Sequence, residues 1–228
     1  MSGLAVQIGI LAGLQSEARC LSGLVPPHRI ALSGARLDGA RRAARRLVEG
    51  GATHLLSFGL AGGLDPALAP GTLLLPAQLL TPAGGAVPVD PDWHAAALAL
   101  LRAHRPIQAP VAGSDIAIGT VAAKAALFAT SGGVAVDMES HVLAAAAPAL
   151  PLLIVRVVAD SAADALPPAA LVGIKPDGAT DLAAVLASVL RRPAQIPALM
   201  RLGRAATKAT ETLRAAARLG AASGFGLV

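Results

Sequence analysis

The chain has 228 residues, of which 54% are hydrophobic and 14% charged, and its formal net charge is +5. This composition excludes a disordered chain, and the length suits one sizeable α/β domain or two small ones. With no Tyr, one Trp and three Phe, the sequence lacks the aromatic residues on which nucleic-acid bases stack, so we expect no nucleic-acid partner.

Three features of the sequence indicate a cytoplasmic protein. Cys20 is the single cysteine, which excludes an internal disulfide framework and fits a reducing compartment. No run of 18 uncharged apolar residues is free of Pro or paired Gly, so we predict no membrane span. No positively charged region precedes the first apolar run, so no secretory signal is evident.

Predicted strands alternate with predicted helices to about residue 160, which is typical of a mostly parallel sheet. The predicted strands span residues 4–12, 29–32, 53–58, 72–76, 107–113, 134–139 and 152–158. One predicted helix begins near Glu17, and the others span residues 40–49, 93–103, 121–130 and 140–147. We expect turns or loops at residues 34–39, 59–63, 77–92 and 113–119.

Several common chemistries are not indicated. The glycines of Gly59–Gly63 let a backbone approach a ligand, but their spacing is neither a dinucleotide fingerprint nor a P-loop. The five histidines are scattered, and no Gly-x-Ser-x-Gly elbow is present, so we predict no metal and no cofactor. Four arginines of the helix at 40–49 are expected to face solvent, with nucleic-acid binding as the less favoured alternative: Arg41, Arg42, Arg45 and Arg46.

Acidic residues stand where predicted strands end. Leu152–Val158 is a branched apolar run typical of a strand covered on both faces, and Asp160 and Asp164 follow it. In open α/β sheets the ligand crevice lies beyond the carboxyl ends of the strands. Apolar walls there can raise the pKa of a carboxyl group and keep it as an acid. Glu17, just past the first strand, and Glu139, at the end of strand 134–139, belong to the same set.

A structural alternative gives each acid an ordinary role. Asp160 and Asp164 would cap helices, Glu17 would be a first-turn acid favoured by the helix dipole, and Glu139 would pair with Arg156. For any single acid we favour this alternative, but for the whole set we favour a functional site.

Four segments occur in the order seen in one superfamily: Ile8–Glu17, Gly59–Gly63, Val136–Glu139 and Arg156–Asp164. Over about residues 4–165 the chain resembles the methylthioadenosine/S-adenosylhomocysteine nucleosidases, within the purine nucleoside and uridine phosphorylase superfamily. The sequences of residues 59–66 and 136–140, together with the tail at 190–202, are most similar to the hopanoid-associated nucleoside phosphorylase/nucleosidase branch.

The resemblance implies a single-domain, three-layer α/β fold, in which helices flank a mixed, mostly parallel sheet, with an extra C-terminal helix. We divide the chain into a nucleoside phosphorylase-like catalytic domain, residues 1–190, and a basic C-terminal helical extension, residues 191–228. The resemblance also implies a homodimer or a higher homo-oligomer.

The resemblance assigns a role to each acid. Asp160 would protonate the purine nitrogen, and Glu17 would position a water molecule below the anomeric carbon. Glu139 would accept hydrogen bonds from both ribose hydroxyls, with Met138 packed against the sugar. The resemblance implies two further loops at the site, one holding the nucleophile and one beside the base: Gly59, Leu60, Ala61 and Gly62, and Ser114, Asp115 and Ile116.

This sequence departs from the family pattern in three places. Leu60 replaces the usual Ser or Thr and so removes a hydroxyl beside the nucleophile, while Asp137 replaces a Glu and Ala159 a Ser. The two arginines with which related phosphorylases hold phosphate correspond here to Glu17 and Ser57.

The resemblance therefore predicts release of adenine from an adenosyl compound by hydrolysis, with adenosylhopane of hopanoid biosynthesis as the expected substrate. One alternative is phosphorolysis of a purine nucleoside, with phosphate as co-substrate and Arg36 or Arg41 reaching in from a neighbouring segment. Another is a non-catalytic protein that binds nucleosides. The expected partner is thus a small-molecule or lipid-linked nucleoside.

A basic helix is predicted from about residue 198 to residue 219. Basic residues cover one side of it and apolar residues the other: Arg201, Arg204, Lys208, Arg214 and Arg218, against Leu199, Leu202, Ala206 and Leu213. The simpler interpretation is a terminal helix packed on the domain. The family resemblance suggests the further hypothesis that this tail docks the protein peripherally at the inner membrane face.

Overall fold

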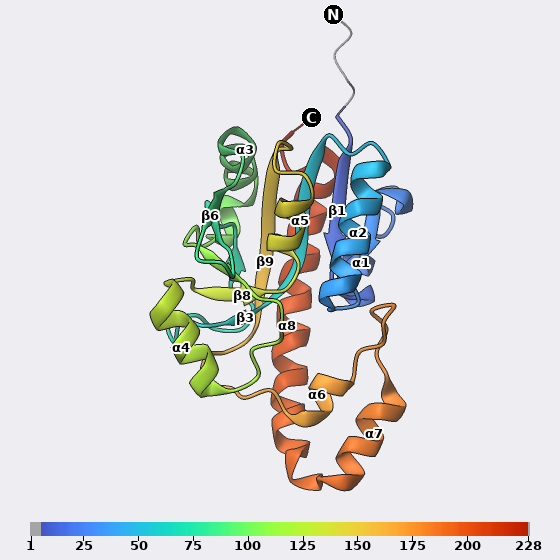
Figure 1. Cartoon of the computed structure of the whole chain (residues 1–228), viewed down its shortest axis with the longest axis vertical. Coiled ribbons are helices and arrows are strands. Elements are labelled where there is room, and N and C mark those ends of the chain that lie inside the picture. The colour runs from blue at the N-terminus through green and yellow to red at the C-terminus, as the bar shows by residue number, and fades with distance from the viewer. Residues whose placement is uncertain (1–5, 228) are drawn as a thin grey trace, which may run out of the picture.

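A central β-sheet carries helices on both faces in the computed structural model, which describes residues 6–227 (Figure 1). The strands are β1 Ile8–Ala12, β2 Ile30–Leu32, β3 His54–Gly63, β4 Leu73–Leu74, β5 Gln78–Leu80, β6 Ala86–Pro88, β7 Val111–Gly113, β8 Ala135–Asp137 and β9 Leu152–Asp160. The α-helices are α1 Gln15–Cys20, α2 Leu37–Glu49, α3 Pro91–Leu101, α4 Val121–Ser131, α5 Ser140–Ala146, α6 Pro168–Val172, α7 Leu182–Arg191 and α8 Ile196–Gly220.

Strand β3 is the centre of the sheet. Its first part pairs in parallel with β1 on one edge and with β9 on the other, while Gly62 and Gly63 at its end pair antiparallel with β8. The strand order is β2-β1-β3-β8-β7-β5-β6, with β4 antiparallel to β9. The β1–β2, β7–β8 and β5–β7 pairs are parallel, so the predicted mixed, mostly parallel sheet is confirmed.

The side chains of β9 alternate between two apolar cores, as the period of two in a strand requires. Leu153 and Val155 lie in a core with residues of α1, α3 and α8. Leu152 and Ile154 lie in a second core with residues of α2 and α5. The predicted three-layer arrangement of helices around one sheet is therefore confirmed.

Helix α8 belongs to the first of these cores along its C-terminal half. Ala209, Leu213, Ala216 and Ala217 are fully buried there. Its N-terminal turns lie with α6 and α7 beyond one end of the sheet, where Met200 is exposed (Figure 1). The packed terminal helix that the sequence predicts is thus present, and the division of the chain at residue 190 stays a prediction.

The predicted loop at Gly59–Gly63 is wrong, because β3 continues through it. Hydrogen bonding to β9 and β8 on both edges overrides the low strand propensity of glycine. These glycines instead allow close packing, since a Cβ on Gly63 would lie 2.7 Å from the carbonyl oxygen of Asp160. The strand therefore carries residues 60–62 directly into the region of the predicted site.

The predicted loop at 77–92 is also partly wrong. It contains the short antiparallel pair β5 and β6, which are three residues each and so too short to give a clear alternating pattern. Smaller differences concern ends of elements. Helix α2 begins at Leu37 inside the predicted turn, β7 is shorter than predicted, and β9 extends to Asp160. Leu4 and Ala5 of the first predicted strand lie outside the described residues.

Candidate active site

Four carboxylates from four segments border one cavity of about 210 Å³. Glu17 comes from α1, Asp137 from the end of β8, Glu139 from the residue before α5, and Asp160 from the end of β9. All four are buried. Since they gather beyond the carboxyl ends of β1, β8 and β9, the crevice lies where open α/β sheets hold their ligands.

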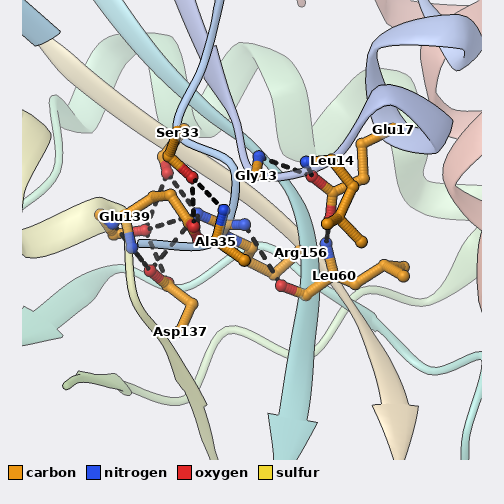
Figure 2. A network of polar contacts seen from close by, with 11 residues as sticks. Gly13, Leu14, Glu17, Ser33, Ala35, Leu60, Asp137, Glu139 and Arg156 are labelled. Carbon is orange, nitrogen blue, oxygen red and sulfur yellow. Dashed lines mark hydrogen bonds and ion pairs between the residues drawn. The ribbon is translucent and has the colours of Figure 1, made fainter. Parts of the chain in front are cut away.

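The Glu17 carboxylate accepts three backbone hydrogen bonds. The N–H groups of Gly13 and Leu14 donate to Oε2 at 2.7 and 2.8 Å, and that of Leu60 donates to Oε1 at 2.8 Å (Figure 2). Burial raises the pKa of Glu17 to about 7, against the opposing effects of Arg156 and of these N–H donors. An ionised carboxylate has about four acceptor positions, so one remains for another donor such as water.

The Arg156 guanidinium lies under the site, fully buried, at the centre of the polar network (Figure 2). Its Nη2 is 3.3 Å from Asp137 Oδ1 and 3.4 Å from Glu139 Oε2, and it donates to Ser57 Oγ at 2.7 Å. Nη1 donates to the Leu60 carbonyl at 3.2 Å. The pairing of Glu139 with Arg156 is therefore present, yet Glu139 also lines the cavity.

Glu139 is held from both sides. The Ser33 hydroxyl donates to Oε1 at 2.8 Å, and Arg156 contacts Oε2. Burial raises the pKa of Glu139, and the neighbouring Asp137 adds to this while Arg156 opposes it. Asp137 itself accepts hydrogen bonds from the N–H groups of Glu139 and Ser140, at 2.8 and 2.7 Å, so it fixes the start of α5.

Glycines make this arrangement sterically feasible. A Cβ on Gly59 would lie 2.6 Å from Arg156 Nη1 and 2.7 Å from the Glu17 carboxyl group. A Cβ on Gly13 would lie 3.0 Å from Glu139 Oε1 and 3.2 Å from Glu17 Oε2. Any side chain at Gly59 would therefore displace the groups of the site.

Asp160 has a partner that the sequence analysis missed. The Lys124 ammonium of α4 donates to Asp160 Oδ2 and also to the carbonyls of Ser161 and Asp164, at 2.7 and 2.8 Å. Burial raises the pKa of Asp160, and Lys124 opposes this shift. The one available signal was a lone charge in the apolar run Val121–Phe128.

The predicted loop residues differ in their position relative to the cavity. Leu60, Ala61 and Gly62 line it, as do Met138 and Ile116. Three others are outside its lining: Gly59, Ser114 and Asp115. Asp115 lies 2.9 Å from His141 Nε2. The remaining walls are apolar and include Ile118 and Leu166. The roles assigned to all these residues stay predictions.

Acidic side chains line the cavity. Among the described residues that line it, none is Lys or Arg. Arg156 lies beneath it among carboxylates, which raise its pKa although burial opposes the charge. Arg36 lies outside the lining, and Arg41 borders a different groove. Within residues 6–227, no group of three or more His, Cys, Asp or Glu side chains is placed to hold a metal ion.

A larger groove of about 710 Å³ lies between α1 and the segment up to β2. Its lining includes Arg19, Leu24 and Pro27 and contains no carboxylate. Size alone would favour this groove, but the buried acids and their counterions favour the smaller cavity as the site of chemistry.

Comparison with known proteins gives one family and many similar folds. The family model described as "Phosphorylase superfamily" matches residues 32–191, which include Glu139 and Asp160 but not Glu17. No curated protein sequence matches the chain.

Among solved structures, S-adenosylhomocysteine nucleosidase from Streptococcus pyogenes, in complex with 5-methylthiotubericidin, is similar with a TM-score of 0.66 and 18% identity. The alignment covers 94% of this chain and 98% of that one. Futalosine hydrolase of Helicobacter pylori gives a TM-score of 0.63 and 16% identity, over 92% and 97% of the two chains. Campylobacter jejuni 5′-methylthioadenosine/S-adenosylhomocysteine nucleosidase gives 0.62 and 20%, over 89% and 99%. At these identities the likeness concerns the fold.

Replacing Arg156 by Met should destabilise the fold by about 3–5 kcal/mol near pH 8, because Asp137 and Glu139 would remain buried without a counterion. The loss should be smaller at pH 5, because the orphaned Glu139 carboxyl group, whose pKa burial already raises, then binds a proton in the folded state. Urea unfolding at both pH values measures this. Arg41→Met is the matched control, since Arg41 pairs with Asp38 at an exposed position. An equal loss at both pH values would show that packing, not orphaned charge, sets the cost.

Proposed function

This chain belongs to the phosphorylase superfamily, and from that premise we propose that it hydrolyses the N-glycosidic bond of an adenosyl compound and releases adenine. It is an enzyme of the N-ribosyl hydrolase or phosphorylase type. The observation that carries the choice of hydrolysis is a cavity lined by four buried carboxyl groups and, within the described residues, by no cation.

The proposed reaction divides its work among three acids. Breaking the bond between C1′ and the purine nitrogen leaves positive charge on the sugar and negative charge on the base. Asp160 transfers its proton to the purine, and Glu17 takes a proton from the water whose oxygen bonds to C1′. Glu139 accepts hydrogen bonds from the ribose hydroxyls. General acid or base catalysis of this kind typically contributes ~10²–10⁴-fold each, and exchange with solvent restores both protonation states.

Phosphate would be poorly held in this cavity. A phosphate dianion needs cationic side chains or a nest of free N–H groups. The N–H groups of Gly13, Leu14 and Leu60 already donate to Glu17, whose carboxylate would repel an anion. Ser57, at the position of a phosphate-binding arginine in related phosphorylases, accepts a hydrogen bond from Arg156. Phosphorolysis is therefore the alternative that the first experiment below must exclude.

We propose that the substrate carries an apolar 5′ substituent, with adenosylhopane as the compound that the hopanoid-branch resemblance favours. Ile116, Ile118 and Leu166 give the cavity apolar walls, and Ile116 is 68% exposed. The Streptococcus pyogenes relative was solved with 5-methylthiotubericidin and a Helicobacter pylori relative with 5′-methylthioadenosine, which supports an adenosyl-like ligand. A homo-oligomeric assembly is proposed on the family resemblance.

We also propose peripheral contact with an anionic membrane, through a surface that differs from the one expected. No helix among residues 6–227 is both long and apolar enough to span a bilayer. Leu182, Leu186 and Leu190 follow one another at helical spacing on α7 and are 69%, 62% and 83% exposed. The surrounding residues 165–208 contain six basic and two acidic side chains. Anionic headgroups attract the basic residues, and the exposed apolar stripe among them can then insert at the membrane surface.

Adenine release tests the reaction itself. The purified protein should release adenine from 5′-butylthioadenosine in phosphate-free buffer and yield the free sugar, not its 1-phosphate. Asp160→Asn should lose this turnover by about 10²-fold or more while still binding the nucleoside. Chromatography of the products, with and without phosphate, distinguishes the outcomes. Strict dependence on phosphate would make the protein a phosphorylase, and binding without release would make it a non-catalytic binder.

The pH dependence tests Glu17. Since burial raises its pKa to about 7 and a base must be unprotonated, kcat/KM should fall tenfold per pH unit below about pH 7. Glu17→Gln should remove this limb and lower turnover severely, whereas Asp38→Asn, at an exposed residue of α2, should leave the profile unchanged. Rates would be measured from pH 5 to pH 9. A limb that persists in Glu17→Gln would assign the base to another residue.

Vesicle sedimentation tests the membrane contact. The full chain should pellet with phosphatidylglycerol vesicles at low salt, and less with phosphatidylcholine vesicles or at high salt. The triple replacement of Leu182, Leu186 and Leu190 by Ser should abolish pelleting and keep adenine release. A wild-type protein that stays in the supernatant contradicts the contact. A triple variant that changes only from oligomer to monomer would identify the leucines as a subunit interface.

A further inference from the structure

A buried lysine of helix α4, Lys124, connects the helix to the end of β9. Lys124 is the one fully buried residue of this helix, and its side chain is about 1% exposed. Its ammonium donates to Asp160 Oδ2 and to the carbonyls of Ser161 and Asp164. The three protons of an ammonium group are thereby all used. Lys124 does not line the cavity, so any effect that it has on a ligand there must pass through Asp160.

Burying the Lys124 ammonium group costs hydration free energy, which its contacts must offset. A buried charge recovers its desolvation cost only with good hydrogen-bonding geometry, and apolar residues of similar volume often stabilise a fold as well or better. Leu127 and Phe128 of α4 already pack against an apolar cluster. Stability alone therefore gives little reason to bury a lysine one turn earlier. The position of its partner at the end of β9, in the cavity wall, suggests a role in the reaction.

We propose that Lys124 is a positioning residue that orients Asp160 and stabilises the carboxylate left behind when Asp160 gives its proton to the leaving base. This inference rests on the proposed function. Lys124 occupies Oδ2 and leaves Oδ1, which has no hydrogen-bond donor among the described residues. Before the transfer, an ammonium faces a neutral acid, and after it, an ammonium faces a carboxylate. The interaction therefore strengthens as the bond to the base breaks, which is the condition for lowering a barrier.

The chain around Lys124 connects this effect to the binding of the base. Ile116, Ala117 and Ile118 line the cavity, and α4 begins three residues later, at Val121, after the helix cap formed by Thr120. One continuous segment thus supplies part of the apolar cavity wall and the counterion of the acid. Lys124 transfers no proton in this proposal, so the proton balance of the hydrolysis is unchanged.

Two leaving groups separate this role from a structural one. Adenine needs a proton as it leaves, whereas 4-nitrophenolate is a stable anion that needs none. Lys124→Met should lower kcat on 5′-butylthioadenosine by about 10²-fold, within the range of general acid catalysis. On the 4-nitrophenyl riboside with the same 5′-butylthio group, kcat should change less than about threefold, because that step bypasses general acid catalysis. Lys208→Met, at an exposed lysine of α8, is the matched control and should match wild type on both substrates.

The pH profile and a double variant complete the test. Because Asp160 must be protonated to act as the acid, kcat for 5′-butylthioadenosine should fall at alkaline pH. Loss of the ammonium raises the pKa of Asp160 further, so this alkaline limb should move to higher pH in Lys124→Met. Lys124→Met combined with Asp160→Asn should be no slower than Asp160→Asn alone, because Lys124 acts through Asp160.

Equal losses on both substrates, or an unmoved alkaline limb, would overturn the proposal and leave Lys124 a structural residue. Should Lys124→Met fail to fold, Lys124→Gln keeps N–H donors for the two carbonyls without the charge and must show the same preference between substrates. If wild type cleaves neither substrate, the proposed function fails. If wild type cleaves both and Lys124→Met loses both equally, only the role of Lys124 fails.

Discussion

The buried guanidinium of Arg156 is the interaction on which the site depends. Desolvation opposes the ionisation of Glu17 and Glu139, and a single cation, which also contacts Asp137, offsets that cost. The parallel pairing of β3 with β9 places Gly59 opposite Arg156. The absence of a side chain at Gly59 leaves room for the Glu17 carboxyl group and for the guanidinium, which reaches the Leu60 carbonyl. Strand register, a glycine and a buried cation are thus parts of one constraint.

The acids of the cavity have two separate counterions. Arg156 contacts Asp137 and Glu139 and lies close enough to lower the pKa of Glu17, whereas Lys124 contacts Asp160. The hydrolysis proposed above uses one carboxyl group to give a proton and another to take one. Environments that differ in their cations allow neighbouring acids to hold different protonation states. This separation of charge, more than the number of acids, suits the cavity to cleavage of a bond between a sugar and a base.

The acidic residues at the strand ends were predictable from the sequence, whereas their partners from distant parts of the chain were not. Asp160 and Glu139 follow apolar runs, so the rule for open α/β sheets placed them correctly at one crevice. Lys124 and Ser33 reach their acids across separations of 36 and 106 residues, which no local pattern encodes. The loop expected at Gly59–Gly63 failed for a related reason. Glycine content predicts a turn locally, whereas pairing with β8 and β9, distant in sequence, decides the backbone.

The C-terminal region shows how the same amphipathic pattern can serve two purposes. In α8 the apolar residues Leu213 and Ala216 face the sheet and are fully buried, so the sequence pattern there is explained by the core. In α7 the stripe of Leu182, Leu186 and Leu190 has no such cover among the described residues, and none of the residues of this helix is fully buried. Burying a leucine side chain is worth about 1.5–3 kcal/mol, so three uncovered leucines at one end of the molecule favour an external apolar partner.

A neighbouring segment connects that end to the site, because the Gln15 N–H donates to the Gly178 carbonyl between α6 and α7. The segment before α7 would therefore link a partner that covers α7 to the start of α1, the helix that carries Glu17.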